Sequence, residues 1–170
     1  MGLFSSTTLD SLETLFLDQL QDLYDAEQRL TKALPKMASA SHNASLRSAF
    51  EQHLHETENQ VSRLEQVFQM MGQSPQSKTC EAMKGLVQEG DEVISADGDA
   101  DVKDAALIAA AQRVEHYEIA AYGAARTFAQ ELGRNDAAQL LQQTLQEEKA
   151  ADDKLNQLAM QRINTRAARS

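Results

Sequence analysis

The chain has 170 residues, of which 26 are acidic and 16 basic, so its formal net charge is −10. This length fits one domain over residues 1–170, and the acidic balance disfavours nucleic acids and membrane surfaces as partners but suits cations. The single cysteine excludes an intrachain disulfide, and no stretch approaches the roughly 18 apolar residues of a membrane span.

The composition predicts an all-α protein. Ala, Leu, Gln and Glu dominate, whereas the chain has two prolines and no tryptophan. We expect residues 1–7 to be disordered. The first helix then carries an apolar stripe from Phe16 to Met37, in which steps of four and three residues alternate. Glu27 falls in this stripe, so a carboxylate is expected on the buried face.

The second helix shows a stripe from Phe50 to Phe68, in which Glu58 takes an apolar position. His55 precedes Glu58 by three residues and shares its side of the helix, which makes both candidate metal ligands. A shift of the stripe by one residue would turn Thr57 inward instead. His53 lies off this stripe, and we expect it at the surface.

A long crossover, residues 73–100, follows the second helix, and its amphipathic part predicts a short fifth helix. The third stripe runs from Ile108 to Leu132 and the fourth from Leu141 to Leu155. Two hairpins joined by a long crossover predict a ferritin-like up-down four-helix bundle with a short fifth helix in the crossover. The last two stripes contain the acidic residues Glu115, Glu118, Glu148 and Asp152.

These acidic residues are expected at matching heights. Glu27, Glu58, Glu118 and Glu148 each lie about 13 or 14 residues from a predicted turn, or roughly 20 Å along a helix. Glu115 and Asp152 form a second level, about 17 residues from their turn.

Burying several carboxylates together is unfavourable unless cations neutralise them, so the sequence predicts bound divalent cations. The alternative is a set of salt bridges with Arg29, Lys149 and Lys154 at a loosely packed surface. A site rich in carboxylate and poor in histidine favours hard cations.

The segments LYDAEQRLTKALPKMA (23–38), HLHETENQVSRLEQVF (53–68), EHYEIAAYGAARTFA (115–129) and LQEEKAADDKL (145–155) resemble the YciE/YciF family of bacterial stress-associated ferritin-like proteins. This resemblance implies a rubrerythrin-like bundle, a homodimer, a bacterial cytoplasmic setting and a di-iron site. It implies two divalent metal ions, iron foremost and manganese as the alternative. The expected ligands are Glu27, His55, Glu58, Glu115, Glu118, Glu148 and Asp152.

The sequence is compatible with three functions. The first is a redox enzyme in which bound iron reacts with dioxygen or peroxide, the second is a metal-buffering protein without turnover, and the third is a structural dimer with a degenerate site. The sequence has no nucleophile elbow, phosphate-binding glycine loop or cysteine pair, so hydrolase, kinase and thiol-redox functions have no support.

Overall fold

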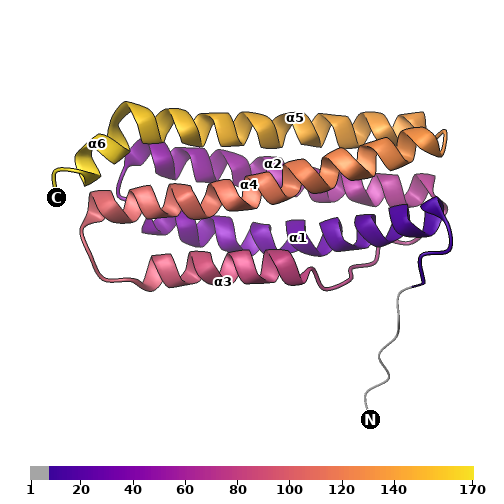
Figure 1. Ribbon diagram of the computed structural model, residues 1–170, viewed down its shortest axis with the longest axis horizontal. Helices are drawn as coiled ribbons and strands as arrows, with labels where there is room; N and C mark the ends of the chain where they lie inside the picture. The colour runs from indigo at the N-terminus through magenta and orange to yellow at the C-terminus, as the bar shows by residue number, and fades with distance from the viewer. Residues whose placement is uncertain (1–7) are drawn as a thin grey trace, which may run out of the picture.

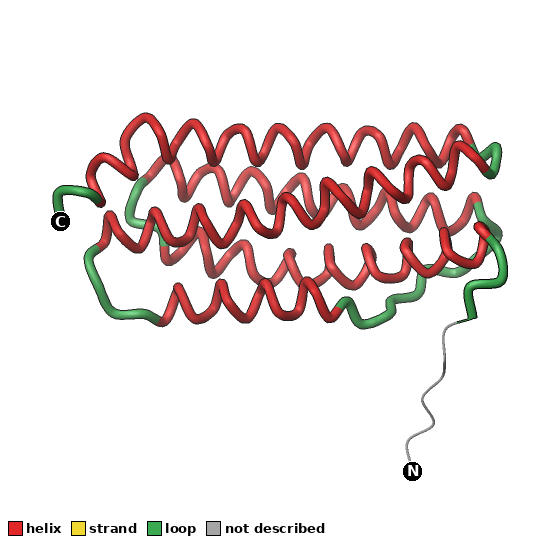
Figure 2. Tube along the Cα trace, viewed as in Figure 1, coloured by secondary structure: helices red, strands yellow, loops and turns green. Residues whose placement is uncertain are grey.

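The computed structural model describes residues 8–170, and the disorder predicted for residues 1–7 lies outside the described residues. Within residues 8–170, four long helices run side by side: α1 (Leu12–Ala40), α2 (Ala44–Met70), α4 (Ala100–Glu131) and α5 (Asn135–Leu158) (Figure 1). No strand occurs in this described part of the chain (Figure 2). The all-α class predicted from the composition is confirmed.

Short turns join the long helices in two antiparallel pairs. Residues 41–43 connect α1 to α2, and residues 132–134 connect α4 to α5. In addition, α1 contacts α4 and α2 contacts α5, so each long helix has two long neighbours. Every long helix therefore presents one face to a common central axis.

The remaining helices lie at the side and at the end of this arrangement. Helix α3 (Glu81–Ser95) forms within the predicted crossover and packs against α1 and α4 (Figure 1). After α5 the chain continues through a π-helical turn, η1 (Ala159–Ile163), and α6 (Asn164–Ala167), which both contact α4. None of the helices in residues 8–170 combines the length and the apolar character that crossing a membrane requires.

Local sequence signals define where the long helices begin and end. The side chains of Ser11, Asn43 and Asp99 each accept a hydrogen bond from the backbone in the first turn of α1, α2 and α4. Gly72 and Gly133 follow α2 and α4 with φ angles of 68° and 70°. In this left-handed region a side chain would be strained, so glycine favours the end of each helix.

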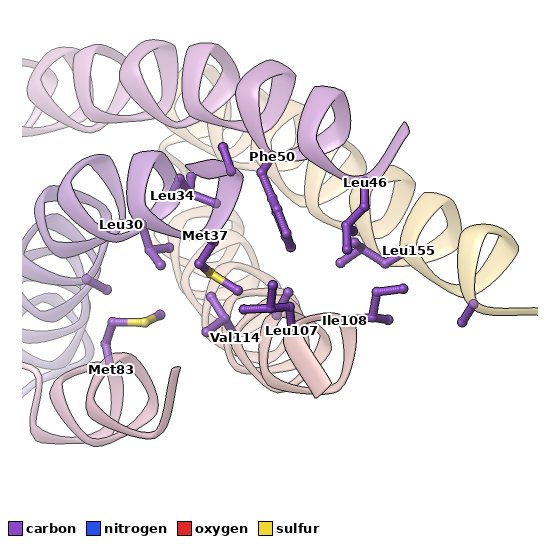
Figure 3. Close-up of a cluster of buried hydrophobic side chains, with 14 of the residues drawn as sticks. Leu30, Leu34, Met37, Leu46, Phe50, Met83, Leu107, Ile108, Val114 and Leu155 are labelled. Atoms are coloured by element: carbon purple, nitrogen blue, oxygen red, sulfur yellow. The ribbon is translucent and has the colours of Figure 1, made fainter. Parts of the chain in front are cut away.

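Two apolar cores fill the space between the helices, one at each end of the molecule. The first core lies where α1 ends and α2 begins and includes Leu30, Leu34, Met37, Leu46, Phe50, Met83, Leu107, Ile108, Val114 and Leu155 (Figure 3). The second core lies at the opposite end and includes Phe16, Leu20, Leu23, Leu64, Val67, Phe68, Tyr122, Leu141 and Leu145. Buried polar side chains separate the two cores.

Asp104 of α4 connects the two hairpins. Its side chain is fully buried, and its two carboxylate oxygens accept hydrogen bonds from the backbone N–H groups of His42 (2.8 Å) and Asn43 (2.7 Å). These N–H groups belong to the turn between α1 and α2. The carboxylate therefore holds this turn against the beginning of α4.

Replacing Asp104 should destabilise the fold. We expect Asp104→Ala to lower the free energy of unfolding by about 1.5–3 kcal/mol, because hydrogen bonds to a buried charged acceptor are lost. The measurement is urea denaturation followed by circular dichroism. Asp97→Ala is the matched control, since Asp97 is exposed. Equal stability of the two variants would contradict the role of Asp104.

Candidate functional site

A layer of buried polar side chains lies between the two apolar cores. All four long helices contribute to it, and each member is at most 5% exposed. This polar layer consists of Glu27 from α1, His53, Thr57 and Gln60 from α2, Glu115 and Glu118 from α4, and Glu148 from α5.

Five members of the polar layer form what we call the central cluster: Glu27, His53, Glu115, Glu118 and Glu148. One nitrogen or oxygen atom from each of the last four lies within 4.8 Å of the others, which is a spacing that one cation could bridge. His53 Nε2 lies 3.4 Å from Glu115 Oε1 and 3.5 Å from Glu148 Oε2. Glu27 adjoins this group. Burial raises the pKa of Glu118 most, and charge repulsion from Glu27 raises it further.

Neighbouring polar groups orient the central cluster from outside. His53 Nδ1 lies 3.3 Å from a carboxylate oxygen of Glu56, which leaves Nε2 directed toward the carboxylates. Gln60 donates a hydrogen bond to Glu148, and the hydroxyl of Tyr122 donates one to Glu27. A carboxylate that holds the far nitrogen of a histidine, as Glu56 does, is typical of metal-binding histidines.

A second ring of interactions supports Gln60. Its amide nitrogen also donates to Glu147 (3.1 Å), and Arg63 forms two hydrogen bonds to Glu147, one of 2.7 Å. Arg63 is therefore paired with Glu147, which lies outside the central cluster. Among the described residues, no lysine or arginine forms an ion pair with the four glutamates of the central cluster.

Many polar atoms of the layer have no hydrogen-bond partner among residues 8–170. Such atoms are rare in folded proteins, and several of them close together are typical of sites that bind a cation or share a proton. The atoms are Oε2 of Glu27, Glu115 and Glu148, both carboxylate oxygens of Glu118, Nε2 of His53 and Oε1 of Gln60.

The electrostatics of the central cluster favour proton uptake when no cation is bound. Burial, followed by repulsion from Glu148, raises the pKa of Glu27 to about 8. Burial also raises the pKa values of Glu115 and Glu118 well above the usual range for a carboxyl group. Burial alone would lower the pKa of His53, but the surrounding carboxylates, Glu115 foremost, raise it to about 10. A cation that bound to these atoms would therefore compete with protons for them.

Four of the seven residues predicted from the sequence lie together in the central cluster: Glu27, Glu115, Glu118 and Glu148. Asp152 lies one turn along α5 from Glu148, with its side chain 20% exposed. It accepts a hydrogen bond from Gln112 (3.0 Å) and lies 3.3 Å from His116 Nε2. Asp152 thus belongs to the edge of the layer rather than to the cluster.

The predicted inward orientation of His55 and Glu58 is wrong. Their side chains are 79% and 58% exposed and face solvent together, 3.5 Å apart. Thr57 faces inward, which was the alternative register, and His53, which we expected at the surface, is buried.

The reason is that α2 packs against both α1 and α5. Apolar residues on two sides of α2 face these two helices, and the residues between them point to the centre of the bundle. The sequence does contain a pattern that indicates this inward face. The spacing of His53, Thr57, Gln60 and Leu64 also alternates between four and three residues.

The chain is thus an all-helical protein with a buried cluster of one histidine and several glutamates. Residues 11–168 match the family described as "Domain of unknown function (DUF892)", and the chain belongs to this family. The sequence is 47% identical to Protein YciF of Escherichia coli over 160 residues, which are 94% of this chain and 96% of that protein. The predicted resemblance to the YciE/YciF family is confirmed.

Solved structures agree with this assignment. The crystal structure of the Escherichia coli stress protein YciF matches with a TM-score of 0.88 and covers 91% of this chain and 98% of its own. The Rhodopseudomonas palustris protein YcfI is 47% identical, with a TM-score of 0.86 and coverage of 90% and 98%. A Xanthomonas campestris protein, 24% identical with a TM-score of 0.68 over 86% and 89% of the two chains, shares the fold alone.

The raised pKa values predict how the stability of the cation-free protein depends on pH. Because the pKa of Glu27 rises from 4.5 to about 8 on folding, its contribution is present below about pH 4.5 and is lost as the pH rises through 8. The shift of His53, from 6.5 to about 10, acts in the same direction at higher pH. In the presence of a chelator, we therefore expect the free energy of unfolding to fall between pH 5 and pH 8. Glu27 alone accounts for at most about 4 kcal/mol, at about 1.4 kcal/mol per pH unit.

Urea denaturation at several pH values measures this dependence. Glu27→Gln should make the dependence shallower, whereas Glu58→Gln, which changes an exposed carboxylate of α2, should leave it as in the wild type. Stability that rises between pH 5 and pH 8 in the wild type would contradict the electrostatic account of the central cluster.

Proposed function

We propose that this chain is a ferritin-like protein that binds divalent metal ions at the central cluster. The observation that supports the proposal is the convergence of buried carboxylate oxygens without hydrogen-bond partners among residues 8–170. Their spacing and the absence of nearby lysine or arginine in this part of the chain leave a negative charge that cations would neutralise. Four carboxylates carry the charge that two divalent cations balance.

The donor set indicates which cations fit. Four carboxylates and one imidazole are hard or borderline ligands and suit iron or manganese better than metals that prefer thiolates. Glu27, His53, Glu115, Glu118 and Glu148 would hold the ions. Glu56 would keep His53 oriented, and Tyr122 would do the same for Glu27. Bound iron would supply electrons to a small oxidant such as dioxygen or hydrogen peroxide.

A role in the stress response is part of the proposal. The Escherichia coli relative is described as a stress protein, and the two chains are 47% identical over nearly their full lengths. A protein that sequesters iron, or that consumes an oxidant with it, would limit oxidative damage during stress. Metal binding is the property common to both possibilities, and peroxide consumption by the iron-loaded protein separates turnover from storage.

Removing two carboxylates of the central cluster should abolish metal binding. We expect the double variant Glu27→Gln with Glu118→Gln to retain at least about tenfold less iron or manganese than the wild type, because both substitutions remove negative charge from the ligand set. The measurement is metal content per chain by mass spectrometry after loading and gel filtration. Metal should also stabilise the wild type against heat, by about 2.7 kcal/mol at a hundred times the dissociation constant.

The matched control is the double variant His55→Gln with Glu58→Gln, which changes an exposed pair on α2. It should bind metal as the wild type does. Equal metal content in the two double variants, with helix content unchanged by circular dichroism, would refute the assignment of the site.

A further inference from the structure

The central cluster is enclosed, so a cation needs a passage to reach it. A cavity of about 230 Å³ lies between α2 and α5 and has His53 and Glu115 in its wall. By contrast, the hollow lined by Arg126 and the glutamines of α5, and the hollow around Pro35, have no member of the central cluster in their walls. The first cavity therefore connects solvent to the cluster on the His53 side.

The outer part of this cavity is open to water. Gln52, Ala150 and Lys154 contribute to its wall and are exposed, whereas His53 and Glu115 are 5% and 2% exposed. The wall thus runs continuously from exposed to buried residues. The small side chains of Ala49, Ala150 and Ala151 leave the space that larger residues would fill.

The polar groups along the wall are arranged for a cation. The side chain of Glu56 is 30% exposed, and His53 lies between it and Glu115: Nδ1 is 3.3 Å from Glu56 and Nε2 is 3.4 Å from Glu115. His53 Nε2 and Glu115 Oε2 have no hydrogen-bond partner among residues 8–170. The wall therefore offers a carboxylate on the outer side of the His53 ring and another on its inner side, and a cation moving inward would exchange the first for the second.

We propose that the cavity between α2 and α5 is the passage through which divalent cations enter and leave the central cluster, with Glu56 as the first ligand on the way. This inference rests on the proposed metal-binding function and adds the route. The net charge of −10 attracts cations to the surface in general, and Glu56 directs them to this opening. Lys154 also lines the opening, is exposed, and opposes cation entry.

Obstruction of the passage should slow the exchange of cations without changing their equilibrium affinity. We expect Ala150→Phe to slow both association and dissociation of Co²⁺ by about tenfold and to change the dissociation constant less than about twofold, because a barrier on the route affects both rates equally. Stopped-flow absorbance and equilibrium titration measure the two quantities. Ala120→Phe is the control, since Ala120 is an exposed helical alanine of α4 away from the cavity.

Changes of charge along the passage should act with opposite signs. Lys154→Gln should accelerate Co²⁺ association by about two- to threefold, because it removes a repulsion. Glu56→Gln should slow association several-fold, because it removes an attraction, and it should also weaken the affinity, because Glu56 orients His53. Glu58→Gln and Lys149→Gln are the controls, since both residues are exposed and neither lines the cavity. Neither control should change the association rate beyond the general effect of net charge.

Two results would be decisive against the inference. If the wild type binds Co²⁺ stoichiometrically but Ala150→Phe takes it up as fast as Ala120→Phe, the passage lies elsewhere and the proposed function survives. If the wild type binds no Co²⁺, Mn²⁺ or Fe²⁺ at equilibrium, the proposed function itself fails, and the passage fails with it.

Discussion

The main physical constraint on this structure is the repulsion between carboxylates that are buried halfway between two apolar cores. Two carboxylates about 4 Å apart repel by about 4 kcal/mol even at an effective dielectric constant of 20. In the central cluster, oxygens of Glu115, Glu118 and Glu148 lie within 4.8 Å of one another, and Glu27 adjoins them. The cores on either side pack the four helices tightly and keep these side chains from turning outward to water. The repulsion must therefore be relieved inside the protein, by protons or by cations.

The surroundings of the central cluster show how such a site is held in shape. Glu56, Gln60 and Tyr122 each contact one member of the cluster and fix the direction of its side chain. Arg63 is the nearest arginine, and it pairs with Glu147 outside the cluster. Its charge therefore does not neutralise the four glutamates directly, and His53 is the basic side chain among them.

Much of the architecture follows from the sequence because helix formation and capping are local. The stripe from Phe16 to Met37, the cap at Asn43 and the glycine at position 133 each act over a few residues, and they place the turns close to where the structure has them. For the same reason Glu27, Glu118 and Glu148, each set among apolar neighbours on its own helix, were expected inside. Short turns are also enough to pair α1 with α2 and α4 with α5.

The sequence by itself thus determined the helices, their order and four of the carboxylates that lie in the central cluster. The tertiary structure alone decided which face of α2 points inward. Hydrophobicity favoured the line through Leu54, Glu58 and Val61, but α2 lies between two neighbours, and both flanks of its inner face are covered by protein. His53 and Gln60 lie innermost, where they contact Glu115 of α4 and Glu148 of α5. These partners come from distant parts of the chain, so the pattern of α2 alone does not reveal them.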